Sequence, residues 1–599
     1  MKKDLGIKLG KTFEYRGEIY KIFILFVFIL LGCRMAYLQV IKEDKYKYLA
    51  QKNRVKLRKV DAERGNIYDS NGDLVVTNVL GYRLVYLEQR TVSDEQLKEM
   101  SELTGYDTDY LEKRVKYGEI IPYTKENVLI EDLDLEVAHK LMEKISSYPY
   151  LEVQSYSKRK YIYDSLAAHT IGYVKKITGK EYEELKDKGY SPRDIIGKNG
   201  VEKIYDYQMK GKPGYDYIEV NALNKAQKIE KSKAPEQGYD LHLSLDMRLQ
   251  RDMEKIFREE KLTGSLVAME AQTGKIITMV SYPTYSLQTF SSRISQEEWS
   301  RITNDPRKPL TNKSIAGEYP SGSTFKPFSA IAFFNNGLDP NTTIYDNGVY
   351  RIGKWAWKAW KHGGHGYVDF EKSIVESVNP YYYKYADEFG HEPIVEVGDR
   401  FGYGKLTGID IYGERGGVLP SEKWKKKKYK QNWYKGDTIN MSIGQGYLLA
   451  TPIQVAVSYM GLANRGKAYV PHVGDYLQNG DKKIEIKPEV LFNNNKYPSW
   501  YYNVMNKALI NTVEKKNGTA KILRTPGLKI AAKSGSAQNS KYDKTHAWVA
   551  GYFPADKKPE IVFTVLLEGA GGGGSMAGGV AKKFVDKYLE YYSKEMKWI

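Results

Sequence analysis

The chain has 599 residues, too many for one hydrophobic core, so its length predicts roughly two to four domains. Apolar residues make up 41% of the chain and charged residues 28%, which excludes a disordered or collagen-like protein and predicts a folded body. Lysine and arginine total 92 against 74 for aspartate and glutamate, an excess that fits nucleic acid, an anionic membrane surface or an acidic polymer as a neighbour.

An apolar segment near the N-terminus is the first predicted element. It is uninterrupted over residues 22–33 and continues to Ile41 past Arg34, so it has the roughly 20 residues that a helix needs to span a bilayer. The side chain of Arg34 can reach the interface from its place near the far end of the span. Basic residues are frequent before the span, so the positive-inside rule places residues 1–21 in the cytoplasm and the chain after residue 41 outside it.

Two alternatives stay open for this segment. The sequence Leu30-Leu31-Gly32-Cys33 resembles the end of a lipoprotein signal, in which Cys33 would carry the lipid. A cleaved signal peptide would need a small-residue cleavage site, which is not evident after the apolar run. Both alternatives also place the rest of the chain across the membrane. Cys33 is the only cysteine, which excludes an intramolecular disulfide and a cysteine-rich zinc site.

Residues 42–235 alternate strand-like and helical patterns without a catalytic signature, which predicts an α+β domain. The clearest strand is 82–87, and helical spacing occurs over 94–103 and 133–145. A polar stretch at 230–238 is predicted to be a linker.

Residues 236–599 begin with a strand pattern at 239–245 and helical spacing over 249–257. Two strand-like runs, 265–270 and 275–280, are separated by residues that favour a hairpin connection. A matching strand at 561–568 and an amphipathic helix from about Ala577 close the chain, so we expect its terminal segments to meet in one sheet. The lysine-rich run 424–430 has no nucleic-acid motif beside it, which favours a solvated loop and no nucleic-acid partner.

Ser323 and Lys326 form the first pattern that carries chemistry. A helix starting near Ser323 would place the hydroxyl and the amine on one face, and a neutral lysine beside a serine can activate it as a nucleophile. The same S-x-x-K pattern also occurs at Ser157–Lys160, so it does not identify a site by itself.

Two further motifs follow in the order found in penicillin-interacting enzymes, Ser377-Val378-Asn379 and Lys533-Ser534-Gly535. The hydroxyl and amide of the second motif can relay a proton and hold a peptide, while the cation and hydroxyl of the third can bind a carboxylate. The apolar run 528–532 predicts that the third motif lies on a strand edge, where a peptide can add as an extra strand. Gly535 allows a close backbone approach, and Ser536 can offer a backbone N–H to an oxyanion.

With these motifs the chain resembles the class B penicillin-binding proteins, most closely the elongation-type penicillin-binding protein 2, over nearly its whole length. Besides the motifs, the passages that carry the resemblance are RGNIYD from Arg64, GKNGVEKIYD from Gly197, EYPSGSTFKP from Glu318, KHGGHGYVD from Lys361, WYKGDTINMSIGQGYLLATPIQ from Trp433 and AAKSGSAQ from Ala531. The resemblance implies an α+β protein with a cytoplasmic tail (1–21), a transmembrane helix (22–41), an elongated pedestal or dimerisation domain (42–235) and a transpeptidase domain (236–599) whose five-stranded antiparallel sheet is flanked by helices.

The resemblance also implies a serine-type D-Ala-D-Ala transpeptidase that cross-links peptidoglycan stem peptides during cell elongation and is trapped by β-lactams. Ser323 would attack the D-Ala-D-Ala carbonyl with Lys326 as base, and the backbone N–H groups of Ser323 and Ser536 would hold the oxyanion. The remaining roles implied by the family are proton transfer to the leaving amine by Ser377 and Lys533, peptide binding by Asn379, and carboxylate binding by Ser534 and Ser536 beside Gly535.

Some members of the family carry a zinc site built from two aspartates, a histidine and a cysteine. Asp346 and His365 match two of these ligands, but Ala359 and Val378 stand at the other two positions and cannot bind metal. We therefore expect no cofactor, unless His362 substitutes as a ligand. Family members work beside a SEDS-type glycosyltransferase and a cell-shape scaffold protein at the inner membrane, with the catalytic domain in the periplasm.

Other functions remain to be weighed against cross-linking. A D,D-carboxypeptidase or a β-lactamase would use the same chemistry with water in place of the acceptor amine. A division-type transpeptidase would catalyse the same reaction in the division machinery. A catalytically silent scaffold that activates a SEDS glycosyltransferase is the non-enzymatic alternative, and the three intact motifs argue against it.

Overall fold

The computed structural model describes residues 3–44, 55–86, 92–117, 119–120, 127–148, 150–192, 194–220, 226–292 and 294–594. The chain divides into two compact units, one made of residues 1–62 and 212–236 and the other of residues 63–211 and 237–599. The domain boundaries expected from the sequence, at residues 21, 41 and 235, stay predictions.

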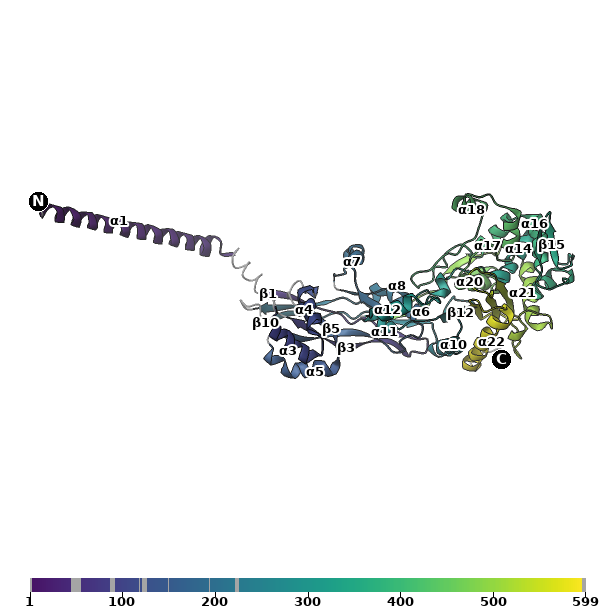
Figure 1. Ribbon diagram of the computed structural model, residues 1–599, viewed down its shortest axis with the longest axis horizontal. Helices are drawn as coiled ribbons and strands as arrows, with labels where there is room; N and C mark the ends of the chain where they lie inside the picture. Colours follow the sequence, from purple (N-terminus) through teal and green to yellow (C-terminus); the bar gives the residue numbers. More distant parts are fainter. Residues whose placement is uncertain are drawn as a thin grey trace. The chain divides into compact units, whose positions relative to one another are not determined.

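The first unit contains the apolar helix and a small sheet. Helix α1 (Lys3–Ala36), drawn in purple in Figure 1, continues into a π-helical turn (Tyr37–Ile41). Residues 16–41 have a mean hydropathy of 2.2 in their most apolar stretch and are long enough to cross a membrane, by length and composition. The sheet is antiparallel in the order β1-β9-β10, with bounds Val55–Val60, Gly214–Val220 and Ala226–Lys233.

Strand β10 corrects one expectation, because residues 230–233 of the predicted linker belong to it. Ile229 pairs with Ile218 of β9, and the ladder continues to Lys233. The residues around Ile229 are mostly charged or polar, so this strand lacks the apolar alternation by which a half-buried strand is recognised. The sequence pattern therefore does not reveal that this segment pairs with β9 as a strand.

The second unit opens with an eight-stranded mixed sheet in the order β20-β19-β11-β2-β3-β5-β4, with β6 paired to β3. Strands from before and after residue 235 therefore share one sheet. Helices α3, α4 and α5 contribute to the small core at one end, which contains Met100, Leu111 and Leu141. The bounds are β2 Ile67–Tyr68, β3 Leu74–Tyr86, α3 Asp94–Thr104, α4 Thr108–Tyr117, β4 Glu119–Ile120, β5 Asn127–Leu133, α5 Leu135–Lys144, β6 Leu151–Tyr161, β11 Asp240–Leu243, β19 Gly474–Asn479 and β20 Lys482–Glu485.

A second sheet in this unit has five antiparallel strands in the order β13-β12-β24-β23-β22, as the family resemblance implies. The N-terminal hairpin β12 (Gly264–Glu270) and β13 (Ile276–Tyr282) pairs with β24 (Ile561–Leu567) near the C-terminus, which confirms that terminal segments of this part of the chain meet in one sheet. Strands β23 (His546–Phe553) and β22 (Ala531–Ala537) complete it, and β22 is an edge strand.

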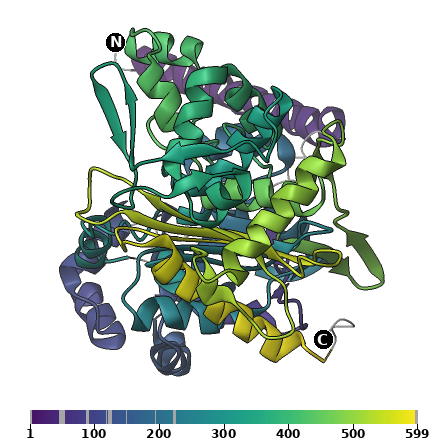
Figure 2. The same ribbon diagram turned by 90° about the vertical axis from the view of Figure 1, so that its right-hand side faces the viewer.

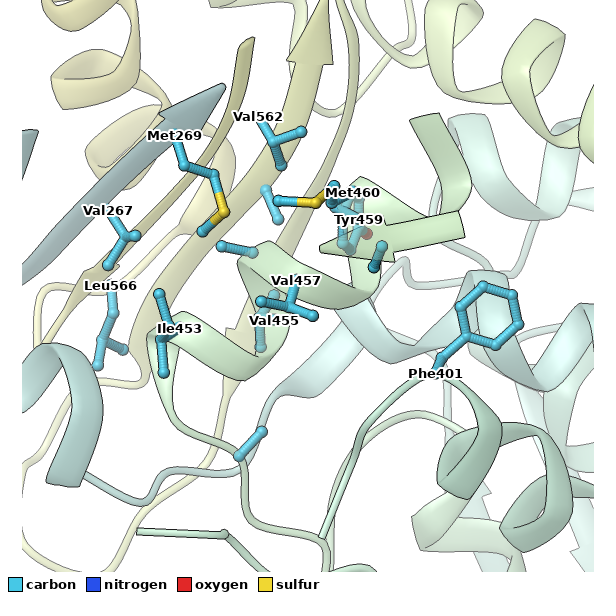
Figure 3. Close-up of a cluster of buried hydrophobic side chains, with 14 of the residues drawn as sticks. Val267, Met269, Phe401, Ile453, Val455, Val457, Tyr459, Met460, Val562 and Leu566 are labelled. Carbon is cyan, nitrogen blue, oxygen red and sulfur yellow. The ribbon is translucent and has the colours of Figure 1, made fainter. Parts of the chain in front are cut away.

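Both faces of this sheet are buried, because alternate residues of each strand face opposite ways. Val267 and Val562 belong to one hydrophobic cluster, while Leu266 and Phe563 belong to another. Helix α20 (Pro452–Ala463) packs on the first face, and Figure 3 shows its residue Ile453 facing the strands that carry Val267, Met269, Val562 and Leu566. Helices α10 (Met247–Glu259) and α22 (Gly578–Tyr592) cover the second face, and Figure 2 shows the yellow strands between the yellow C-terminal helix and the green helices.

The remaining elements lie in the same unit. Those before the second sheet are α6 Ala168–Ile171, β7 Val174–Lys176, α7 Gly179–Leu185, β8 Ile195–Gly197, α8 Gly200–Ile204 and α9 Asp206–Met209. Those after β13 are α11 Leu287–Ser291, α12 Gln296–Thr303, α13 Lys313–Ala316, α14 Lys326–Asn335, β14 Ile344–Asp346, β15 Val349–Ile352, β16 Trp355–Lys358, β17 Gly366–Val368, α15 Phe370–Val375, α16 Asn379–Phe389, α17 Glu392–Arg400, α18 Glu422–Tyr429, α19 Lys435–Met441, β18 Lys467–Tyr469, β21 Val490–Asn493 and α21 Ser499–Glu514.

Helix α18 replaces the solvated loop predicted for the lysine-rich run. The Ser421 side chain caps the helix by accepting a hydrogen bond from the Trp424 N–H. Lys425 points inward, is buried and pairs with Asp437 at 2.5 Å. An inward lysine with a carboxylate partner is not distinguishable from its solvated neighbours by sequence.

Candidate active site

Ser323 lies on a 3₁₀ turn (Gly322–Phe325) that runs directly into α14, so the predicted helix begins just after the serine. Gly322 has a φ of +56° and donates its N–H to the Gly444 carbonyl at 2.9 Å. A Cβ on Gly444 would lie 2.2 Å from the Gly322 carbonyl oxygen, so only glycine permits this approach. Ser323 is half-buried.

Lys326 occupies the first position of α14 and is fully buried. Its Nζ donates to the Ser377 carbonyl at 2.8 Å, to Asn379 Oδ1 at 2.7 Å and to Ser377 Oγ at 3.2 Å. The first and second motifs are therefore joined by one amine, although they are far apart in sequence.

Ser377 lies between α15 and α16 with a φ of +55°, a left-handed conformation that costs a non-glycine residue about 1–3 kcal/mol. This backbone turn presents both its carbonyl and its hydroxyl to Lys326. Asn379 begins α16, with its side chain half-buried beside them.

Lys533 reaches the same hydroxyl from β22. Its Nζ donates to Ser377 Oγ at 2.9 Å and to the Ser534 carbonyl at 2.9 Å. Because β22 is an edge strand, one side of its backbone is open to an added peptide strand, as predicted for the third motif.

The rest of the third motif lies along the same strand. Ser534 is buried, and a Cβ on Gly535 would lie 3.2 Å from both the Ser321 carbonyl and Trp548. Ser536 is exposed, and its Oγ accepts from the Gly573 N–H at 3.1 Å.

Burial controls the charge of both lysines. It lowers the pKa of Lys326 well below the usual lysine value, and the nearby charge of Lys533 lowers it further. Burial also lowers the pKa of Lys533, to about 7. A neutral amine next to a serine can accept its proton, so this arrangement supplies a general base near neutral pH.

The competing S-x-x-K pattern forms no such site. Ser157 and Lys160 lie on strand β6, where residues three apart face opposite sides of the sheet.

Two side chains beside the site were not predicted from the sequence to have a functional role. Gln445, within the passage that starts at Trp433, donates its Nε2 to the Ser536 carbonyl at 3.4 Å. Glu568, at the end of β24, accepts from the Tyr319 hydroxyl at 2.7 Å and from the Tyr542 hydroxyl. Its carboxylate thus ties the segment before Ser323 to the turn after β22, and no local pattern predicts a contact between residues so far apart.

The residues at the family's zinc position do not fit a zinc ion. Asp346 and His365 do meet, with Oδ2 2.6 Å from Nδ1, and both side chains are buried. The Asp346 carboxylate also accepts the backbone N–H groups of Gly348 and His365, while His362 is exposed. Within the described residues, no group of three or more metal-binding side chains is present. The structure offers a buried hydrogen-bonded pair where a metal would need four ligands.

Comparison with known proteins places this geometry in a family. Residues 264–590 match the penicillin binding protein transpeptidase domain, and residues 59–243 match the penicillin-binding protein dimerisation domain. The chain belongs to the class B penicillin-binding proteins. The peptidoglycan D,D-transpeptidase MrdA of Haemophilus influenzae is 34% identical to it, over 92% of this chain and 88% of that protein.

Solved structures of the family are similar as well. The penicillin-binding protein PBP2 of Helicobacter pylori, in complex with MreC, aligns with a TM-score of 0.80 and 29% identity, over 90% of this chain and 99% of that one. A structure described as a peptidoglycan synthase complex that coordinates polymerization and crosslinking aligns with a TM-score of 0.71 and 26% identity, over 96% of this chain and 98% of that one.

Proposed function

We propose that this penicillin-binding protein is an elongation-type peptidoglycan D,D-transpeptidase whose nucleophile is Ser323. The observation that carries the proposal is the shared hydroxyl of Ser377, which accepts hydrogen bonds from both Lys326 and Lys533. This network joins a buried base and a proton path to the edge strand β22, and Ser323 lies on the 3₁₀ turn that leads directly into Lys326.

The reaction begins when neutral Lys326 accepts the Ser323 proton. The serine oxygen attacks the carbonyl of the penultimate D-Ala of a stem peptide that lies along β22, and the backbone N–H groups of Ser323 and Ser536 receive the oxyanion. The C–N bond then breaks, and the departing D-Ala amine takes a proton through Ser377 from the two lysines. The product of this half-reaction is an ester between Ser323 and the donor peptide.

The second half-reaction runs through the same groups in reverse. An amine of a neighbouring stem peptide attacks the ester, loses its proton toward Lys326, and releases Ser323 with a new peptide bond between the two stems. Asn379 holds the donor peptide, while Ser534 and Ser536 bind its terminal carboxylate before D-Ala leaves. A β-lactam stops at the ester stage, because its ring-opened product stays attached to Ser323.

The apolar helix supports a location at the membrane. Residues 16–41 are apolar and long enough to span a membrane. Basic residues before the span support a cytoplasmic N-terminus and a periplasmic catalytic part, anchored in the inner membrane. The relatives solved with MreC and as a synthase complex support a cell-shape scaffold protein and a SEDS-type glycosyltransferase as partners.

Labelling with fluorescent penicillin tests the nucleophile. We expect Ser323→Ala to abolish the label and Lys326→Ala to slow it by about 10²–10⁴-fold, the usual contribution of a general base. Ser157→Ala is the matched control, because it removes the serine of the competing pattern, and it should label like the wild type. Persistent labelling of Ser323→Ala would rule out this serine.

Product analysis then separates the related activities. With peptidoglycan strands as substrate, the transpeptidase gives dimeric stem peptides together with D-Ala. Release of D-Ala without dimers would identify a carboxypeptidase, and absence of both products together with penicillin labelling of Ser323 would favour a scaffold function.

A further inference from the structure

The segment 344–368, which contains strands β14 to β17, exposes an unusual number of aromatic rings. The exposed fractions are 67% for Tyr345, 65% for Trp355, 63% for Trp360 and 72% for Tyr367. Single exposed apolar residues are common on soluble proteins, but a group within one short segment indicates a binding surface.

These rings are held in defined positions. Tyr345 lies directly opposite Tyr367 in the β14–β17 ladder, with ring centroids 5.3 Å apart. The ring of Trp360 contacts His365 at 5.4 Å, and His365 is fixed by its 2.6 Å hydrogen bond to the buried Asp346. The buried pair therefore supports the β14–β17 ladder, which carries the two tyrosines, and the tryptophan that contacts His365.

The segment is also basic. Its exposed cations are Arg351, Lys354, Lys358 and Lys361, and its only acidic residue, Asp346, is buried. The Nζ of Lys354 lies 5.6 Å from the ring centroid of Trp355, at the tip of the β15–β16 hairpin. Aromatic faces with cations among them suit a ligand that has rings and negative charge.

A cavity of about 240 Å³ lies between this segment and helix α16. Tyr345 and Tyr350 line it on one side, and Pro380 and Lys384 of α16 line it on the other. Pro380 directly follows Asn379 of the second motif, so α16 carries both a wall of the cavity and a residue of the catalytic network. Its volume suits one sugar ring better than a drug-sized ligand.

We propose that the segment 344–368 binds the glycan strand of the polymer whose stem peptide enters the active site. This inference rests on the proposed function, since a bound stem peptide brings its own glycan close to the catalytic serine. The C–H faces of the sugar rings lie on the aromatic faces of Tyr345, Trp355, Trp360 and Tyr367. The exposed lysines and arginine attract the carboxylates of the polymer.

The binding experiment uses the full chain in detergent and glycan strands from which the stem peptides have been removed. Tryptophan fluorescence and co-sedimentation measure affinity, with free stem pentapeptide and a single-stranded DNA oligonucleotide as comparison ligands. We expect the double variant Trp355→Ala/Trp360→Ala to bind stripped strands at least about tenfold more weakly, from the loss of two aromatic contacts. Tyr207→Ala is the matched control, because this ring is 62% exposed on α9, outside the segment. It should bind like the wild type.

Circular dichroism and the unfolding midpoint verify that each variant is folded. We expect both substitutions to leave the fold intact, because the two tryptophans are exposed. The proposal is overturned if the folded double variant binds stripped strands as tightly as the wild type, or if the oligonucleotide binds as tightly as the glycan. It is also overturned if only Lys354→Gln/Lys358→Gln weakens binding, since binding would then depend on charge and not on the rings. A dimer that light scattering detects in the wild type but not in the double tryptophan variant would overturn it as well, since the rings would then bind a second copy of the chain. Failure of the proposed function would appear separately, as absent penicillin labelling of wild-type Ser323.

Discussion

The hydroxyl of Ser377 is the residue on which the chemistry of the three motifs converges. It accepts from Lys326 Nζ at 3.2 Å and from Lys533 Nζ at 2.9 Å, and its strained left-handed backbone brings its carbonyl to Lys326 as well. Two buried amines that share one hydroxyl repel each other when both are protonated. The charge of either lysine therefore regulates the basicity of the other.

The pH dependence of acylation should report this coupling. Lys326 acts as a base only when neutral, so the rate of penicillin labelling should rise with pH as Lys326 loses its proton. The charge of Lys533 lowers the pKa of Lys326, and Lys533 is itself charged below about pH 7. Lys533→Gln removes that charge and raises the pKa of Lys326, so the acid limb of the rate profile should move to higher pH.

The measurement is the position of this limb, which is independent of how far the variant lowers the maximal rate. Lys529→Gln, a change at a lysine just before β22, is the control and should leave the limb in place. A limb that stays fixed or moves to lower pH in Lys533→Gln would contradict the coupling.

At the scale of elements, the turn of residues 538–545 connects β22 to β23 beside the active site. Tyr542 in this turn and Tyr319 before the nucleophile both donate to Glu568, which follows β24. Three segments that flank the catalytic strand are thereby held by one carboxylate. Hydrogen bonds to charged groups contribute about 1.5–3 kcal/mol each, enough to determine whether the turn stays ordered.

Removing this carboxylate should loosen the turn and slow acylation. Glu568→Gln weakens both hydrogen bonds, so we expect faster hydrogen–deuterium exchange over residues 538–545 and several-fold slower penicillin labelling. Glu560→Gln, at the opposite end of β24, is the matched control and should change neither. Unchanged exchange in Glu568→Gln would show that other contacts order the turn.

Much of the second sheet and the three catalytic motifs could be predicted from the sequence, because each has a local sequence signal. Strands β12, β13 and β24 and helix α10 carry clear periodicity, and the motifs at Ser323, Ser377 and Lys533 are recognised by their order. The contacts of Glu568 depend on chain folding over long separations and have no such signal. Strand β10 could not be predicted because its residues are mostly charged or polar and give no strand pattern. Helix α18 could not be predicted because the buried Lys425 has the same sequence signature as the solvated lysines beside it.

At the scale of the whole molecule, a buried ionic network links distant passages of the second unit. Arg64 pairs with Glu202 at 2.6 Å and with Asp206 at 2.7 Å, and Arg159 pairs with Glu202 at 2.8 Å. The passages RGNIYD and GKNGVEKIYD, which carry part of the family resemblance, supply three of these residues. Glu202 is fully buried between two guanidinium groups, so its charge is required for both of them.

Glu202→Gln should therefore destabilise the protein by about 3–5 kcal/mol, the cost of leaving buried charges without their partner. Exposed Glu136, which pairs with Lys140, gives the control Glu136→Gln, whose effect should stay within about 1 kcal/mol. The measurement is the urea midpoint of unfolding at neutral pH.

Acidification should reduce the difference between the wild type and Glu202→Gln. Burial opposes ionisation of Glu202, but Arg159 and Arg64 outweigh it, so its folded pKa lies below the usual value of 4.5. A carboxylate with a lowered folded pKa stabilises the protein above the unfolded pKa and loses this contribution as pH falls through the folded value. The two midpoints should thus be furthest apart at neutral pH and approach each other below pH 4.5. A constant separation down to that range would mean that the two arginines do not depend on the charge of Glu202.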